Sequence, residues 1–207
     1  MVDAAGATTP RAIHPLFVRV THWVNAFAIF VMVLSGWRIY NASPLFRFEF
    51  PPAFTLGGWL AGALAWHFAG MWLLALNGAA YLAYGIVSGH FRKSFLPVSF
   101  LRALDDVIRA SQGRLHHAPG RYNAAQRVLY IGVVLAVIVA ILSGLAIWKP
   151  VQLQGLTALM GGYEAARRVH FFAMAAIVAF LVVHIGLAVS VKGILAPMFT
   201  GRAEAPQ

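Results

Sequence analysis

Four long stretches of this chain are almost free of charge, and each is long enough to cross a lipid bilayer, which takes about 20 apolar residues. They cover residues 17–40, 59–87, 129–148 and 169–191. Charge enters only near the two ends of the first stretch, at Arg19 and Arg38. The stretches show no alternation with a period of two, so they predict helices rather than the strands of a barrel. We therefore expect an all-α membrane protein, an up-down-up-down bundle of four transmembrane helices in one domain covering residues 1–207.

The distribution of basic residues predicts an orientation for these helices. The chain carries 16 Lys and Arg against 6 Asp and Glu, a net charge of +10. Eleven of the basic residues lie in the termini and in the connection 88–128, and five lie towards the opposite side. Because cytoplasmic loops are enriched in Lys and Arg, both termini and this connection are predicted to be cytoplasmic. A nucleic-acid partner is not expected, since the charges flank membrane spans and no binding motif accompanies them.

The absence of cysteine narrows the redox chemistry that the chain can carry. It excludes iron–sulfur clusters, covalently attached c-type haem, thiolate metal sites and disulfides.

We see no internal repeat and no low-complexity segment in the sequence.

Four histidines fall inside the apolar stretches, where ionisable side chains are costly and therefore point to function. They are His22, His67, His170 and His184. The last two lie 14 residues apart on one helix. That spacing is about 40° short of four full turns, so both project from nearly the same face, about 21 Å apart along the axis. The alternative for each histidine alone is a side chain that is hydrogen-bonded to a neighbouring helix.

Depth in the membrane predicts how the four histidines pair. His22 lies early in the first stretch and matches His184, while His67 lies in the outer part of the second and matches His170. The second match requires a helix to extend or tilt, because His67 lies well inside its stretch and His170 lies near the edge of its own. Two pairs of imidazoles at two depths, on facing helices, are the ligands that two non-covalent b-type haems need.

Three further residues are candidates for contact with haem. Gly36 and Gly70 lie at the level of the outer haem and near His67, where glycine lets a flat macrocycle approach the backbone. Arg19, one turn before His22, is placed to pair with a propionate. The alternatives are that the glycines serve helix packing and that the arginine is an interfacial anchor.

The segments 19–25 (RVTHWVN) and 122–127 (YNAAQR), together with the pair His170 and His184, resemble the prokaryotic cytochrome b561 family. This family includes the membrane cytochrome b subunits of nickel–iron hydrogenases and formate dehydrogenases. The resemblance covers nearly the whole chain. It implies a four-helix, di-haem, quinone-linked electron carrier of the bacterial inner membrane.

The resemblance also implies residue roles. His22 and His184 would ligate a cytoplasmic-side haem, and His67 and His170 a periplasmic-side haem. Asn123 and Gln126 match polar residues that family members place at a quinone site, and an amide can both donate to and accept from a quinone oxygen. N-capping of the third helix is the alternative for Asn123.

The leading hypothesis is an electron-transfer cytochrome b subunit that links the quinone pool to a periplasmic redox partner. Within the family that partner is a molybdenum enzyme, a hydrogenase or dehydrogenase, or a cytochrome c. One alternative is a stand-alone superoxide:quinone oxidoreductase. Another is a small histidine-dependent metal or proton transporter, which predicts carboxylates beside the histidines, yet no Asp or Glu lies in any of the four stretches. A purely structural anchor leaves the four histidines unexplained.

Overall fold

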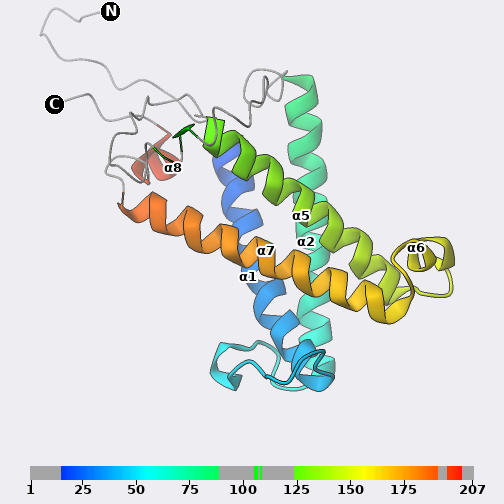
Figure 1. Ribbon diagram of the computed structural model, residues 1–207. Helices are drawn as coiled ribbons and strands as arrows, with labels where there is room; N and C mark the ends of the chain where they lie inside the picture. Colours follow the sequence, from blue (N-terminus) through cyan, green and yellow to red (C-terminus); the bar gives the residue numbers. More distant parts are fainter. Residues whose placement is uncertain (1–14, 89–104, 107, 109–123, 191–194, 202–207) are drawn as a thin grey trace, which may run out of the picture. The chain divides into compact units, whose positions relative to one another are not determined.

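The computed structural model describes residues 15–88, 105–106, 108, 124–190 and 195–201, and within them the chain is helical, with no strand. Figure 1 shows the elements in order along the chain. They are α1 (Leu16–Ala42), the 3-10 turn η1 (Pro52–Phe54), α2 (Leu60–Val87), α5 (Ala124–Trp148), α6 (Gln154–Leu159), α7 (Tyr163–Ser190) and α8 (Ala196–Thr200).

Four of these helices, α1, α2, α5 and α7, are long and apolar enough to cross a membrane. They coincide with the four predicted stretches, so the expectation of an all-α chain with four membrane-spanning helices is confirmed. The largest difference lies at α7, which begins at Tyr163 rather than at residue 169. Its first turns hold Glu164 and Arg167, which form an ion pair at 3.0 Å. Charged residues such as these end the apolar stretch that hydropathy detects, but the helix itself continues through them.

The longer α7 changes the place of His170 within its helix. His170 is the eighth residue of α7, and His67 is likewise the eighth residue of α2. The match in depth between the two histidines stays a prediction.

The chain divides into two compact units, Met1–His90 with Ala188–Gln207, and Phe91–Leu187. Each is described here by itself, and the single domain covering residues 1–207 stays a prediction.

In the first unit α1 and α2 run antiparallel and pack closely through small residues. Ala28 on α1 and Ala63 on α2 are fully buried. Gly70 of α2 lies directly against α1, because a Cβ atom built on it would come within 2.8 Å of Met32 Cγ. Large side chains such as Phe27 and Leu76 are more than half exposed. Small residues inside and large apolar residues outside is the pattern expected of helices that associate within lipid.

The connection between α1 and α2 is held at both ends by side-chain hydrogen bonds. The Asn41 amide accepts from Phe50 N at 2.9 Å and donates to Phe50 O at 2.7 Å. The indole of Trp37 stacks on the Phe50 ring with centroids 4.6 Å apart. The loop is therefore fastened to the last turns of α1 although it contains three prolines.

In the second unit α5 and α7 are also antiparallel neighbours, joined through α6. The hydroxyl of Thr157 donates to Ala146 O at 3.2 Å, which fastens α6 to the end of α5. Gly161 and Gly162 then turn the chain into α7 with φ angles of +87° and +95°, which only glycine adopts readily. Tyr130 of α5 contacts Phe180 of α7 at the other end of the pair.

Candidate functional site

All four histidines singled out in the sequence lie on helices capable of crossing a membrane. His22 is on α1, His67 on α2, and His170 and His184 are both on α7. Each predicted pair takes one histidine from each unit, so the structure describes each histidine in its own surroundings and both pairings stay predictions.

The imidazole of His67 is held by the neighbouring helix α1. Its Nδ1 atom donates to the carbonyl oxygen of Met32 at 3.0 Å and lies 3.1 Å from Ser35 Oγ. The Ser35 hydroxyl itself donates to Val31 O at 2.6 Å, one turn back along α1. Ser35 is fully buried.

The imidazole of His170 is held in the same way by α5. Its Nδ1 atom donates to Ala140 O at 2.9 Å and lies 3.2 Å from Ser143 Oγ. The Ser143 hydroxyl donates to Val139 O at 2.6 Å, and Ser143 is fully buried. Each unit thus contains the same arrangement of one histidine, one serine and one carbonyl, which we call the serine–histidine module.

These contacts determine which imidazole nitrogen is available to a metal. A carbonyl oxygen can only accept, so Nδ1 carries the hydrogen in both His67 and His170. In the neutral ring the lone pair then belongs to Nε2. A histidine that donates from one nitrogen to a carbonyl and presents the other to iron is the usual form of a metal-ligating histidine, so both residues fit an axial haem ligand.

A glycine lies beside each of these imidazoles. A Cβ atom on Gly36 would be 3.4 Å from His67 Cε1, and one on Gly144 would be 3.2 Å from His170 Cε1. The sequence predicts that Gly36 lies at the level of His67, and the two are in contact. The missing side chain of Gly36 leaves room for the imidazole of His67. The contact of Gly36 with the haem macrocycle stays a prediction.

Gly70 has a different environment from the one predicted. The space in front of it is occupied by Val31, Met32 and Ala28 of α1. Its missing side chain therefore serves the packing of α1 against α2, and its contact with haem stays a prediction.

Both serines and both glycines belong to a short repeat that was not recognised from the sequence alone. Residues 34–40 read LSGWRIY and residues 142–148 read LSGLAIW. The two segments share Leu-Ser-Gly, an isoleucine three residues after the glycine, and an aromatic residue at the end. This signal was present in the sequence, and it corrects the expectation that the chain contains no internal repeat.

The turn of α1 that contains His22 is hydrogen-bonded to α2 by an asparagine that did not stand out in the sequence. Asn77 of α2 donates to Thr21 O at 2.8 Å and to Asn25 Oδ1 at 2.7 Å. Arg19 lies one turn before His22, and its Nε atom is buried with no hydrogen-bond partner among the residues that the structure describes. A buried guanidinium nitrogen that lacks an acceptor fits the predicted pairing with a carboxylate of the cofactor.

His184 lies among aromatic side chains of the second unit. Its ring stacks on Phe180 of the same helix with centroids 5.3 Å apart and contacts Tyr130 of α5 edge-on at 6.3 Å. This environment is apolar, in contrast to the hydroxyl and carbonyl groups around His170.

Of the two residues predicted to contact quinone, one is described by the structure. Gln126 lies in the first turn of α5 and is half-buried. Asn123 lies outside the described residues, so the placement of the two amides on one face stays a prediction.

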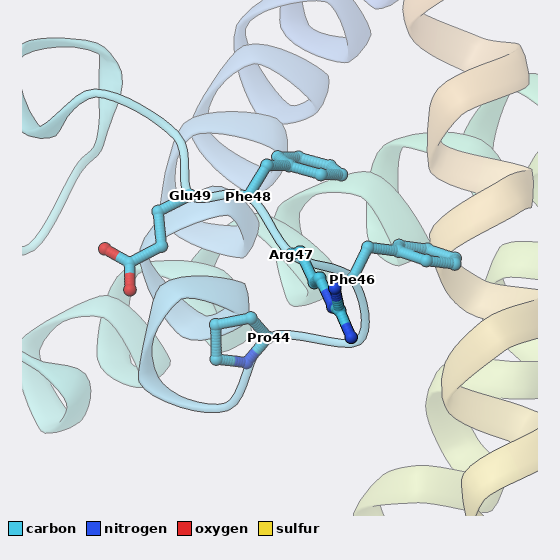
Figure 2. Close-up of a pocket in the computed structure, with 5 residues that line it drawn as sticks. All are labelled: Pro44, Phe46, Arg47, Phe48 and Glu49. Atoms are coloured by element: carbon cyan, nitrogen blue, oxygen red, sulfur yellow. The ribbon is translucent and has the colours of Figure 1, made fainter.

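The loop between α1 and α2 encloses a shallow hollow of about 310 Å³ that is separate from the histidines. Figure 2 shows the five side chains that line it, with Phe46 and Phe48 projecting to one side and Glu49 to the other. The rings of Phe46 and Phe48 are parallel to within 1°. With no histidine and no buried charge in its lining, this hollow is a feature of the loop surface and not of the haem-ligand sites.

Among the described residues no group of three or more His, Cys, Asp or Glu side chains gathers as a metal-ion site. Axial ligation of haem needs only one imidazole on each side of the macrocycle.

Comparison with known proteins gives consistent matches along almost the whole chain. Residues 13–201 match the family described as prokaryotic cytochrome b561. The putative protein-methionine-sulfoxide reductase subunit YedZ1 of Azospira oryzae is 51% identical over 191 residues, which cover 92% of this chain and 96% of that protein.

Two more distant relatives are named as cytochrome subunits of other oxidoreductases. The probable Ni/Fe-hydrogenase B-type cytochrome subunit of Bradyrhizobium diazoefficiens is 26% identical over 90% of this chain and 83% of its own length. The cytochrome b556(fdo) subunit of formate dehydrogenase from Escherichia coli is 25% identical over 88% of this chain and 81% of its own length.

Proposed function

The chain belongs to the prokaryotic cytochrome b561 family of membrane electron carriers, and from this premise we propose that it holds two b-type haems and passes electrons from quinol to a reductase subunit at the outer face. The distribution of basic residues supports a location in the bacterial inner membrane with both termini in the cytoplasm. Lipid surrounds the four apolar helices in this proposal.

His67 and His170 ligate the outer haem in this proposal, and the serine–histidine module is the observation that carries it. Both histidines are the eighth residue of their helix, both donate from Nδ1 to a carbonyl, and both contact a glycine. Two histidines with the same position in their own helices and the same tautomer would suit the two ligands of one haem. Bound haem would supply a one-electron couple, and the chain's own residues would hold, orient and insulate it.

His22 and His184 ligate the inner haem in this proposal. Arg19 contributes a guanidinium group with a buried Nε atom for a propionate, and the amide of Asn77 stiffens the adjoining turn of α1 through Thr21 and Asn25. Asn123, which precedes α5 in the sequence, and Gln126, in the first turn of α5, hydrogen-bond the quinone head group in this proposal. Each amide offers a donor and an acceptor, which matches the hydroxyl of quinol and the carbonyl of quinone.

Methionine sulfoxide is the terminal electron acceptor that the comparisons favour, because the relative at 51% identity is named as a subunit of a protein-methionine-sulfoxide reductase. The stoichiometry is balanced with quinol as the donor. Quinol releases two electrons and two protons as it becomes quinone, and a sulfoxide takes up two of each to give the thioether and water. The haems held by this chain would supply the one-electron couples that link these two-electron reactions, and the reductase subunit would be a separate chain that carries out the oxygen removal.

The experiment is a coupled assay with the purified holoprotein and the reductase subunit that co-purifies with it in mild detergent. We expect quinol to reduce the haems, and methionine sulfoxide to reoxidise them only when the reductase subunit is present. Reoxidation by formate-linked, hydrogen-linked or superoxide-linked partners, with none by methionine sulfoxide, would redirect the proposal to another partner. A haem-loaded protein that quinol cannot reduce would contradict the quinone role.

A further inference from the structure

We propose that Ser35 and Ser143 are positioning residues that set the electron-donating strength of His67 and His170, and through them the reduction potential of the outer haem. This inference rests on the proposed function, since it assumes that both histidines bind iron. It concerns two buried hydroxyl groups to which the proposed function assigns no role of their own.

Each serine hydroxyl donates its hydrogen to a backbone carbonyl, so its oxygen can still accept a hydrogen bond from histidine. Each serine donates its own hydrogen at 2.6 Å to a carbonyl one turn back, which is Val31 O for Ser35 and Val139 O for Ser143. A hydroxyl has one hydrogen and two lone pairs. Its oxygen therefore faces the imidazole as an acceptor, at 3.1 Å from His67 Nδ1 and 3.2 Å from His170 Nδ1.

Each Nδ1–H group is consequently shared between two acceptors, a carbonyl and a serine oxygen. The carbonyls belong to the residues three before each serine, Met32 and Ala140, at 3.0 and 2.9 Å. Acceptors at Nδ1 raise the basicity of the opposite nitrogen. A more basic Nε2 stabilises ferric over ferrous iron, so the serine oxygens are expected to lower the potential of the haem they serve.

A structural explanation of the serines is weaker than this one. Serine inside a helix that bonds back to the preceding turn slightly destabilises and bends that helix, so alanine would serve a lipid-embedded helix better. Both positions are nevertheless fully buried hydroxyls facing a histidine, and they lie in the two copies of the Leu-Ser-Gly repeat. The same geometry in two separate units argues for a shared task at one cofactor.

The chain supplies a matched control for back-bonding. Ser88, at the end of α2, donates to Tyr84 O at 2.7 Å, the same contact one turn back, and it is exposed. Replacing Ser88 removes a hydroxyl of the same local kind far along the helix from His67.

The test is a spectroelectrochemical titration of the purified holoprotein and of Ser35→Ala, Ser143→Ala, the double variant and Ser88→Ala, with haem content measured for each. We expect two haems per chain in all of them. One haem should shift towards the reduced form by about threefold in each single variant and about tenfold in the double variant, which corresponds to about 59 mV for one electron. The other haem and the Ser88→Ala protein should not shift.

The outcomes separate the proposed function from the positioning role. A wild-type chain that binds no haem would overturn the proposed function and this inference with it. If the wild-type chain binds two haems, the variants test the positioning role alone. Haem potentials and electron paramagnetic resonance spectra that are the same in the wild type, in both single variants and in the double variant would overturn that role. Equal shifts of both haems would also overturn it, because the module serves only one pair of ligands.

Discussion

Gly144 lies against the imidazole of His170, and alanine at this position is expected to displace that ring. A Cβ atom would sit 3.2 Å from Cε1 and 3.5 Å from Nδ1 of His170. Carbon atoms in favourable contact are about 3.5–4.0 Å apart, so the ring must retreat by a few tenths of an ångström. That movement lengthens the 2.9 Å contact from Nδ1 to Ala140 O, which fixes the tautomer.

The expected cost of Gly144→Ala can be isolated with a second glycine on the same helix. A Cβ atom on Gly132 would meet no described neighbour within 4 Å. Gly132→Ala should stabilise α5 by about 1 kcal/mol through helix propensity alone. Gly144→Ala gains the same amount and loses about 1–3 kcal/mol to overpacking. The difference between the two variants, about 1–3 kcal/mol, therefore measures the contact with His170.

The assay combines thermal unfolding in detergent with haem content and the reduced-minus-oxidised spectrum. Gly144→Ala should unfold at a lower temperature than Gly132→Ala and should alter or lose one haem. Gly36→Ala is the intermediate case, because its Cβ would lie at 3.4 Å from His67 Cε1, an ordinary contact distance. If Gly144→Ala matched Gly132→Ala in both stability and spectrum, the assignment of Gly144 as the support of a ligand ring would be wrong.

Two further predictions concern the packing of α1 against α2. Gly70→Ala places a Cβ atom 2.8 Å from Met32 Cγ and 3.3 Å from Val31 Cγ1. Gly78→Ala on the same helix, with no described neighbour within 4 Å, is the control and should stabilise α2 by about 1 kcal/mol through helix propensity. Gly70→Ala should therefore be about 1–3 kcal/mol less stable than Gly78→Ala. Asn77→Leu removes the hydrogen bonds to Thr21 O and Asn25 Oδ1 and should cost about 1 kcal/mol in unfolding free energy. A Gly70→Ala chain as stable as Gly78→Ala, or an Asn77→Leu chain as stable as the wild type, would contradict the packing described for that site.

The helices were predictable because the requirement to cross a membrane imposes a long apolar stretch that few other structures share. Their ends were less predictable. Hydropathy marks the part of a helix inside the hydrocarbon, and α7 continues outward through Glu164 and Arg167, which pair with each other on one face. Hydropathy therefore could not show that His170, like His67, is the eighth residue of its helix.

The four histidines could be singled out from the sequence because an ionisable residue within an apolar stretch stands out. The serines and carbonyl groups that contact His67 and His170 could not be singled out in this way. Serine hardly changes hydropathy, and its role depends on which helix lies beside it. The repeated Leu-Ser-Gly segment was the one signal in the sequence that could have pointed to Ser35 and Ser143. The neighbours of Gly70 on α1 were likewise not predictable from its position near His67 in the sequence.

The most direct test of the account is the haem content of histidine variants made in pairs. The wild-type chain should bind two haems, and His67→Ala and His170→Ala should each retain one. The double variant of His67 and His170 should also retain one haem, because both residues serve the same iron, whereas a double variant of His22 and His67 should bind none. A double variant of His67 and His170 that folds but binds no haem would contradict the pairing at the centre of this account.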